Sequence, residues 1–185
     1  MGERIVARWR EWSGDGIQHL ELHGGPAGVV AEAVVVAEEA GHPFAARFKI
    51  ACDGAWRTLR VEAGVVGDER RIDLVGDGDG RWTDGAGTPL PELGGAVDVD
   101  LALTPFTNTL PIRRLGLGAG ESAEIRVVYV ELPAFALTTD PQRYTCLEPG
   151  RRYRYESLES GFVREIDIDG NGLVVTYPGL FRRVL

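Results

Sequence analysis

Two carboxylates placed two positions apart, Asp98 and Asp100, have a spacing that suggests chemistry. Alternate side chains of a strand project from the same face, so both carboxylates would point to one side of a sheet. Paired acids can divide acid and base roles when their surroundings separate their pKa values. Same-face carboxylates also pair with arginine or bind hydroxyl groups without any reaction. The spacing alone leaves both interpretations open.

A second polar set alternates through His19, Glu21 and His23. Two imidazoles and a carboxylate on one strand face can hold zinc or iron, but an ordinary polar sheet face has the same pattern. The sequence contains no nucleophile elbow, phosphate-binding glycine loop or paired Cys-x-x-Cys motif. We therefore expect no metal, no cofactor and no identifiable catalytic residue. The alternative is an enzyme that uses Asp98, Asp100 or His19 for acid-base chemistry.

The run 104–114 places hydroxyl and amide side chains between two prolines and ends on Arg113 and Arg114. Proline fixes φ, so Thr107 and Asn108 would be held in a stiff, preorganised loop. Arginines there could act as bidentate donors to a ligand. The other interpretation is a structural connection whose Thr and Asn side chains bond their own backbone.

Strands must position these residues, because apolar and polar side chains alternate along most of the chain. Segment 29–39 is ambiguous between helix and strand, a short helical turn is expected at 107–114, and 82–115 shows no clear regular structure apart from these features. The predicted strands are 5–12, 17–23, 44–52, 56–63, 70–75, 123–132, 143–147, 153–158, 162–168 and 173–177.

An internal repeat relates the two halves of the sequence. Residues 70–78 align without a gap with residues 164–172, within a longer match of 42–80 with 138–174. The expected fold is one all-β, mainly antiparallel domain spanning residues 1–185. A duplicated curved sheet would form a barrel or half-barrel with at most one or two short helices. Closure of the barrel would remove exposed strand edges.

Composition limits the compartment and the partners. The formal net charge is −8, which disfavours nucleic acid because phosphate binding needs a clustered basic surface. The N-terminal residues are charged and lack the apolar core of a signal peptide, and the longest apolar stretch is too short to span a membrane. Cys52 and Cys146 are too few for a disulfide scaffold, so we expect free, buried thiols and a cytoplasmic protein.

The sequence resembles the bacterial "putative glycolipid-binding" family over nearly its whole length. The run Thr104-Pro105-Phe106-Thr107-Asn108-Thr109-Leu110-Pro111 carries the resemblance most specifically, with further matches at Asp98-Val99-Asp100-Leu101, Val128-Tyr129-Val130 and Gln142-Arg143-Tyr144. The resemblance implies a cytoplasmic all-β protein of unknown function with a lipoprotein-carrier-like half-barrel, whose name is an analogy from fold. One departure is Gln18-His19, where the family pattern leads us to expect Glu-His.

The combined hypothesis is a protein that binds a glycolipid or another amphipathic small molecule. An apolar barrel interior would shelter an acyl chain, and polar groups at the mouth would fix the head group. Whether the barrel is hollow or filled stays open, as does the oligomeric state. A structural or oligomerising β protein is the further alternative. The candidate ligand-binding residues are Trp82, Asp98, Asp100, Thr107, Asn108, Arg113, Arg114, Tyr129, His19 and Arg143.

Overall fold

A computed structural model describes residues 4–185, and these residues form one sheet of fourteen strands. The strand order is β7-β6-β5-β4-β3-β2-β1-β14-β13-β12-β11-β10-β9-β8. Neighbouring strands are antiparallel except for β8 and β9, which are parallel. Within residues 4–185, β7 and β8 each end the sheet, so the all-β prediction is confirmed as an open, curved half-barrel and not a closed barrel.

The strands of the first half follow one another as a meander. They are β1 (Arg4–Glu11), β2 (Ile17–Gly25), β3 (Gly28–Glu39), β4 (His42–Cys52), β5 (Thr58–Val65), β6 (Ile72–Gly76) and β7 (Trp82–Asp84). The strands of the second half are β8 (Asp98–Leu101), β9 (Ser122–Glu131), β10 (Ala136–Glu148), β11 (Arg152–Ser157), β12 (Val163–Ile168), β13 (Val174–Tyr177) and β14 (Phe181–Arg183). The halves join where β1 pairs with β14.

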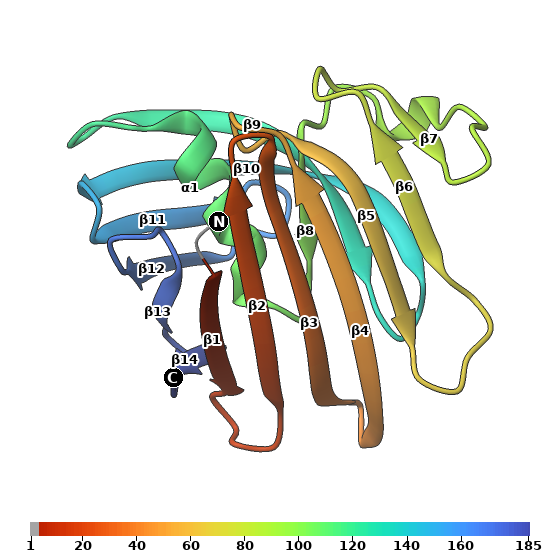
Figure 1. Ribbon diagram of the computed structural model, residues 1–185. Helices are drawn as coiled ribbons and strands as arrows, with labels where there is room; N and C mark the ends of the chain where they lie inside the picture. The colour runs from red at the N-terminus through yellow and green to blue at the C-terminus, as the bar shows by residue number, and fades with distance from the viewer. Residues whose placement is uncertain (1–3) are drawn as a thin grey trace.

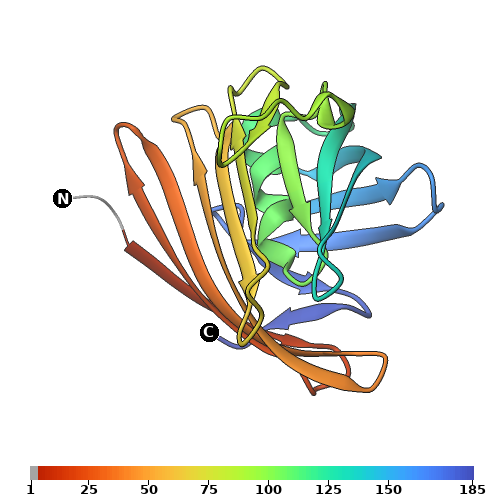
Figure 2. The same ribbon diagram turned by 90° about the vertical axis from the view of Figure 1, so that its right-hand side faces the viewer.

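The sheet folds over a short helical segment. Strands β1–β5 form one wall, and β9–β12 cross behind them (Figure 1). The helical segment consists of η2 (Pro105–Asn108) and α1 (Thr109–Leu115), and it lies between the two walls (Figure 2). A third helical turn, η1 (Pro91–Leu93), lies beside β7. Phe106 and Leu110 of the segment are fully buried, so this segment fills the centre of the half-barrel.

Alternation builds the walls as the sequence predicts. In β4, Ala46, Phe48 and Ile50 are buried, whereas Arg47 and Lys49 between them are exposed. Segment 29–39 belongs to the strand β3, so a helix there is wrong. Its buried and exposed residues alternate with period two, and β-branched valines favour that conformation.

Two further expectations are corrected. Segment 82–115 is not an irregular loop, because it contains β7, η1, β8, η2 and α1. The strand expected from Trp56 begins instead at Thr58, and Trp56 lies in the preceding turn with a φ of +66°. The short helical turn expected near 107–114 is confirmed as the end of η2 and α1. Cys52 and Cys146 are free and buried, as predicted.

Four hairpin turns share one construction. In each, an aspartate oxygen accepts hydrogen bonds from the backbone N–H groups two and four residues on. The aspartates are Asp53, Asp77, Asp84 and Asp169. The residue three positions on has a left-handed backbone, which favours glycine. These residues are Trp56, Gly80, Gly87 and Gly172, with φ of +66°, +92°, +88° and +80°.

Segments 42–80 and 138–174 each supply three consecutive antiparallel strands, β4–β6 and β10–β12. Their origin by duplication stays a prediction. No helix within residues 4–185 has the length and hydropathy needed to cross a membrane.

The turn at Asp169 offers a stability test. One carboxylate oxygen accepts from Asn171 N and Leu173 N, and the other accepts from Arg183 at 2.6 Å. We expect Asp169→Ala to lower the free energy of unfolding by about 1–2 kcal/mol, because it leaves two turn amides without their acceptor. Urea unfolding measures the change. Asp79→Ala is the control: its side chain is 72% exposed, so its removal should cost under about 0.5 kcal/mol. Equal losses would contradict this account of the turn.

Candidate functional site

A concavity of about 930 Å³ opens beside the helical segment, among strands β8–β14. Of the predicted residues, Asp100, Asn108 and Tyr129 line it. Asp140, Ser157 and a group of aromatic side chains complete its walls. The concavity therefore collects side chains from distant parts of the second half of the chain.

Asp100 is the centre of a hydrogen-bond network in this concavity. Its Oδ1 accepts from the Thr107 hydroxyl at 2.8 Å, and its Oδ2 accepts from Gln142 Nε2 at 2.8 Å. The same amide nitrogen donates to Asp140 Oδ2 at 3.0 Å, so one amide group bridges two carboxylates. Burial raises the pKa of Asp100, the bonds from Gln142 and Thr107 lower it, and the charge of Asp140 raises it, with a net increase.

Aromatic rings also line the concavity. The Tyr155 ring packs edge-on against Tyr144, Phe162 and Tyr177, with centroids 5.5, 6.2 and 6.2 Å away. Tyr129 is half-buried, and burial followed by the charge of Asp100 raises its pKa to about 12. Its hydroxyl is therefore protonated at neutral pH and able to donate a hydrogen bond.

Segment 104–114 combines both predicted interpretations. Asn108 lines the concavity, but its Oδ1 accepts from Tyr144 OH at 2.9 Å and its Nδ2 donates to Pro105 O at 3.3 Å. Thr104 caps η2 through Phe106 N and also accepts from Gln18. Because these polar groups are already bonded within the protein, the segment is held rigidly.

Asp98 and Arg114 form a buried ion pair. Asp98 is fully buried, and Arg114 donates to it through two nitrogens, the shorter contact being 2.6 Å. Burial raises the pKa of Asp98 more than Arg114 lowers it. Trp82 is also buried, and its indole N–H donates to Ala96 O at 2.8 Å. These three residues do not line the concavity.

Arg113 and Arg143 lie elsewhere. The Arg113 guanidinium stacks on the Trp56 ring at 5.0 Å in a separate pocket of about 430 Å³. Arg143 alternates with the buried Tyr144 and so faces the outer side of the sheet, where it pairs with Glu124 at 2.5 Å and Glu156 at 3.5 Å.

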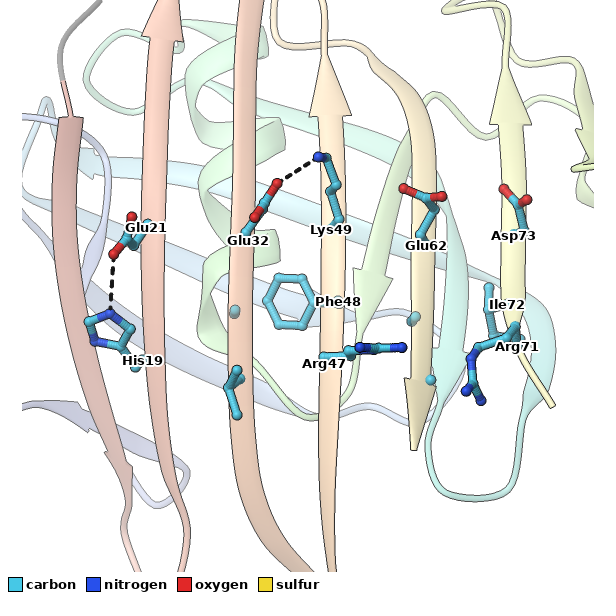
Figure 3. A pocket seen from close by; sticks show the side chains of 14 residues that line it. His19, Glu21, Glu32, Arg47, Phe48, Lys49, Glu62, Arg71, Ile72 and Asp73 are labelled. Carbon is cyan, nitrogen blue, oxygen red and sulfur yellow. Dashed lines mark ion pairs between the residues drawn. The ribbon is translucent and has the colours of Figure 1, made fainter. Parts of the chain in front are cut away.

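His19 lines a third hollow, a groove of about 670 Å³ on the outer face of β2–β6. Glu21, Glu32, Glu62 and Asp73 form a row along one side of this groove, with Lys49 among them. His19, Arg47 and Arg71 form the parallel row along the other side (Figure 3). His19 Nε2 lies 3.6 Å from Glu21, which also contacts His23 at 3.4 Å. His19, Glu21 and His23 thus share one face, as their spacing indicates.

The groove does not hold the three residues of the alternative enzyme hypothesis, Asp98, Asp100 and His19, in one place, and it does not group ligands for a metal ion. Within residues 4–185, no three His, Cys, Asp or Glu side chains are grouped to hold a metal ion. Asp98 is sealed against Arg114, Asp100 lines the concavity, and His19 lies in the outer groove. These three residues therefore do not meet at one centre.

Sequence reasoning missed much of the concavity, including Asp140, Tyr155, Ser157 and Phe162. Alternation places Asp140, Gln142 and Tyr144 on one face of β10, and Tyr155 and Ser157 on one face of β11. The sequence shows this alternation, but alternation does not indicate which face of a strand lines a hollow.

The raised pKa of Asp100 predicts a pH effect. The unfolded carboxyl titrates near about pH 4, so the folded protein retains this proton to higher pH than the unfolded chain. The free energy of unfolding should therefore fall as pH rises through this window, and Asp100→Asn should flatten that slope. Urea unfolding across the acid range measures it.

Asp77→Asn is a control of opposite sign, because the hydrogen bond from Arg81 lowers the pKa of Asp77 to about 2. The stability that Asp77 contributes is present above about pH 4 and is lost as pH falls toward about 2. The substitution should remove that loss. An unchanged slope in Asp100→Asn would contradict the buried network.

Comparison with known proteins agrees with the fold. No protein of curated function matches the chain. The crystal structure of a DUF1089 family protein from Pseudomonas aeruginosa matches with a TM-score of 0.79 and 36% sequence identity, over 90% of this chain and 92% of that chain. A family model described as "Putative glycolipid-binding" matches residues 6–183. Because that match spans almost the whole sequence, the chain belongs to the "Putative glycolipid-binding" family.

Proposed function

We propose that this protein binds a glycolipid or a similar amphipathic small molecule through its head group in the 930 Å³ concavity. The observation that carries the proposal is the pair Asp100 and Asp140, which Gln142 bridges and which lines the same hollow as Tyr129. Membership of the family supports a binding protein.

The chemistry of this hollow suits a sugar. Sugar hydroxyls donate to carboxylates and accept from phenols, and Asp100, Asp140 and Tyr129 offer both kinds of partner. Tyr155 and Phe162 present aromatic surface that can pack on the apolar face of a sugar ring. A small number of polar groups in a partly apolar hollow is the usual design of a small-molecule site.

The apolar tail of the ligand would lie over the edge of the concavity at Val163 and Leu180. The buried side chains of Phe106 and Leu110 lie in the centre of the half-barrel, so we do not place the acyl chain there. Val163 and Leu180 line the concavity and are 42% and 39% exposed. Each methylene covered there would contribute about 0.8 kcal/mol. The proposal thus places the head group inside and the first part of the tail over this edge.

A second candidate is acid-base catalysis on the bound sugar, favoured by the raised pKa of Asp100 beside Asp140. Two carboxylates with separated pKa values can act as acid and base. Turnover of the bound molecule, followed by mass spectrometry, would distinguish this candidate from simple binding.

Native mass spectrometry of gently purified protein, followed by solvent extraction, tests binding directly. The expected result is a co-purified amphipathic molecule with a polar head group. Ligand-free protein from several expression hosts would count against the proposal.

Single polar groups in the concavity should matter for affinity. We expect Tyr129→Phe to weaken binding about two- to tenfold and Asp100→Asn about tenfold or more, because each loses a ligand hydrogen bond. Titration calorimetry with octyl glucoside or the extracted lipid measures the loss. Arg143→Gln on the outer face is the control and should leave affinity unchanged. If Arg143→Gln were the only substitution that weakened ligand affinity, the binding site would lie outside the concavity.

A further inference from the structure

Arg113 differs from the other stacked arginines in its partners. Three arginines lie over aromatic rings: Arg70 over Phe135, Arg164 over Phe162 and Arg113 over Trp56, at 4.4, 4.5 and 5.0 Å. Arg70 is paired with Asp68, and Arg164 donates to two backbone carbonyls. Within residues 4–185, the Arg113 guanidinium has no hydrogen-bond or ion-pair acceptor. Its N–H groups therefore have no acceptor in the part of the chain that the structure describes.

Trp56 occupies the position that is glycine in the equivalent turns of Asp77, Asp84 and Asp169. Its φ of +66° lies in the left-handed region, which is unfavourable for a bulky side chain. The equivalent residues Gly80, Gly87 and Gly172 adopt the same conformation without a side chain. The turn itself thus does not require an indole. What the indole adds is a wall of the 430 Å³ pocket and a stacking surface for Arg113.

Gly172 supports Arg113 from another side. A Cβ at Gly172 would lie 2.8 Å from Arg113 Cδ and 3.2 Å from its Cγ, so the arginine stem packs directly on this glycine. Two turns far apart in the sequence, those of Asp53 and Asp169, therefore fix the stem and the guanidinium of one exposed arginine.

Among residues 4–185, Arg113 brings to the pocket a positive charge without an ion-pair partner, and the pocket also has an apolar wall. Its carboxylate, Asp53, is already bonded to Arg57 at 2.7 Å. Ile5, Leu22 and Val29 line it beside Trp56. Arg113 differs from the other arginines without a carboxylate partner in its stack on Trp56 and in its stem, which packs on Gly172.

We infer that this pocket binds an amphipathic oxyanion: a carboxylate or phosphate group held by Arg113, with its apolar body against Trp56. A planar guanidinium suits bidentate contact with either group. Asn171 lines the same pocket, and a side-chain amide can act as a further donor. This site goes beyond the proposed function, because it shares no lining residue with the concavity.

NMR titration of the full chain tests the site. Octanoate is the carboxylate probe, inorganic phosphate is the free-anion probe, vesicles of phosphatidic acid in phosphatidylcholine present a lipid phosphate, and octyl glucoside is the uncharged control. The Trp56 indole N–H signal is assigned by its loss in Trp56→Gly, and the Arg113 Nε–H signal by its loss in Arg113→Gln. We expect octanoate to shift both signals saturably, and octyl glucoside to leave both unchanged.

Three outcomes would overturn the inference. The first is no saturable octanoate shift of the Trp56 indole. The second is the same shift in Arg113→Gln, a variant that changes only an exposed side chain. The third is free phosphate alone saturating the Arg113 signal as strongly as octanoate, which would remove the role of the apolar body. If the vesicles displace octanoate, the natural ligand is a lipid phosphate. If octanoate binds and the vesicles do not displace it, the natural ligand is a free carboxylate.

Matched variants sharpen the test. Arg113→Lys keeps the charge but loses the planar fork, so octanoate affinity should fall on the order of tenfold. Trp56→Gly introduces the residue that the three equivalent turns have at this position, so the chain should fold while octanoate binding weakens. Arg164→Gln removes another exposed stacked arginine, one that lines the concavity, and should leave octanoate binding unchanged. Loss of binding in Arg164→Gln with Arg113→Gln unaffected would assign the anion to the concavity instead.

Discussion

An open sheet of fourteen strands has one apolar face that must be covered, and four apolar residues of segment 103–112 belong to the core against that face: Leu103, Phe106, Leu110 and Ile112. Phe106 and Leu110 have no exposed surface, and both walls of the folded sheet pack around this segment. Burial of apolar area is the dominant favourable contribution to folding, so the curvature of the sheet and the position of this segment depend on each other. The buried pair of Asp98 and Arg114 anchors α1 to the edge strand β8.

Because the helical segment fills the centre, the hollows of the molecule lie around it. The concavity lies where η2 meets β8–β11, and Thr107 and Asn108 are bonded into its wall. The pocket at Arg113 lies on another side of the same helical segment. One short element thus supplies side chains to two separate hollows, since residues at different positions around a helix point in different directions.

Polar residues here stabilise the fold and form the hollows at the same time. Gln142 is buried, and its amide group bridges Asp100 and Asp140. The hydrogen bonds from Thr107 and Gln142 hold the Asp100 carboxylate in one arrangement before any ligand arrives. Preorganisation lowers the entropic cost of binding a small molecule. Trp56 is a second case in which a residue beside a pocket is held in a fixed position. Its left-handed backbone conformation has a cost in conformational energy.

The sequence by itself determined the all-β class, most strands, the hairpin turns, the short helix near 107–114 and the same-face positions of His19, Glu21 and His23. These follow from alternation and turn residues, which act over a few neighbours. Only the tertiary structure decided that Asp98 is sealed by Arg114, that Arg113 lies on Trp56, and that Asp140 joins Asp100. The partners in these pairs are 16, 57 and 40 positions apart along the chain. Their meeting depends on how the sheet curves around its filled centre, and no local pattern encodes that curvature.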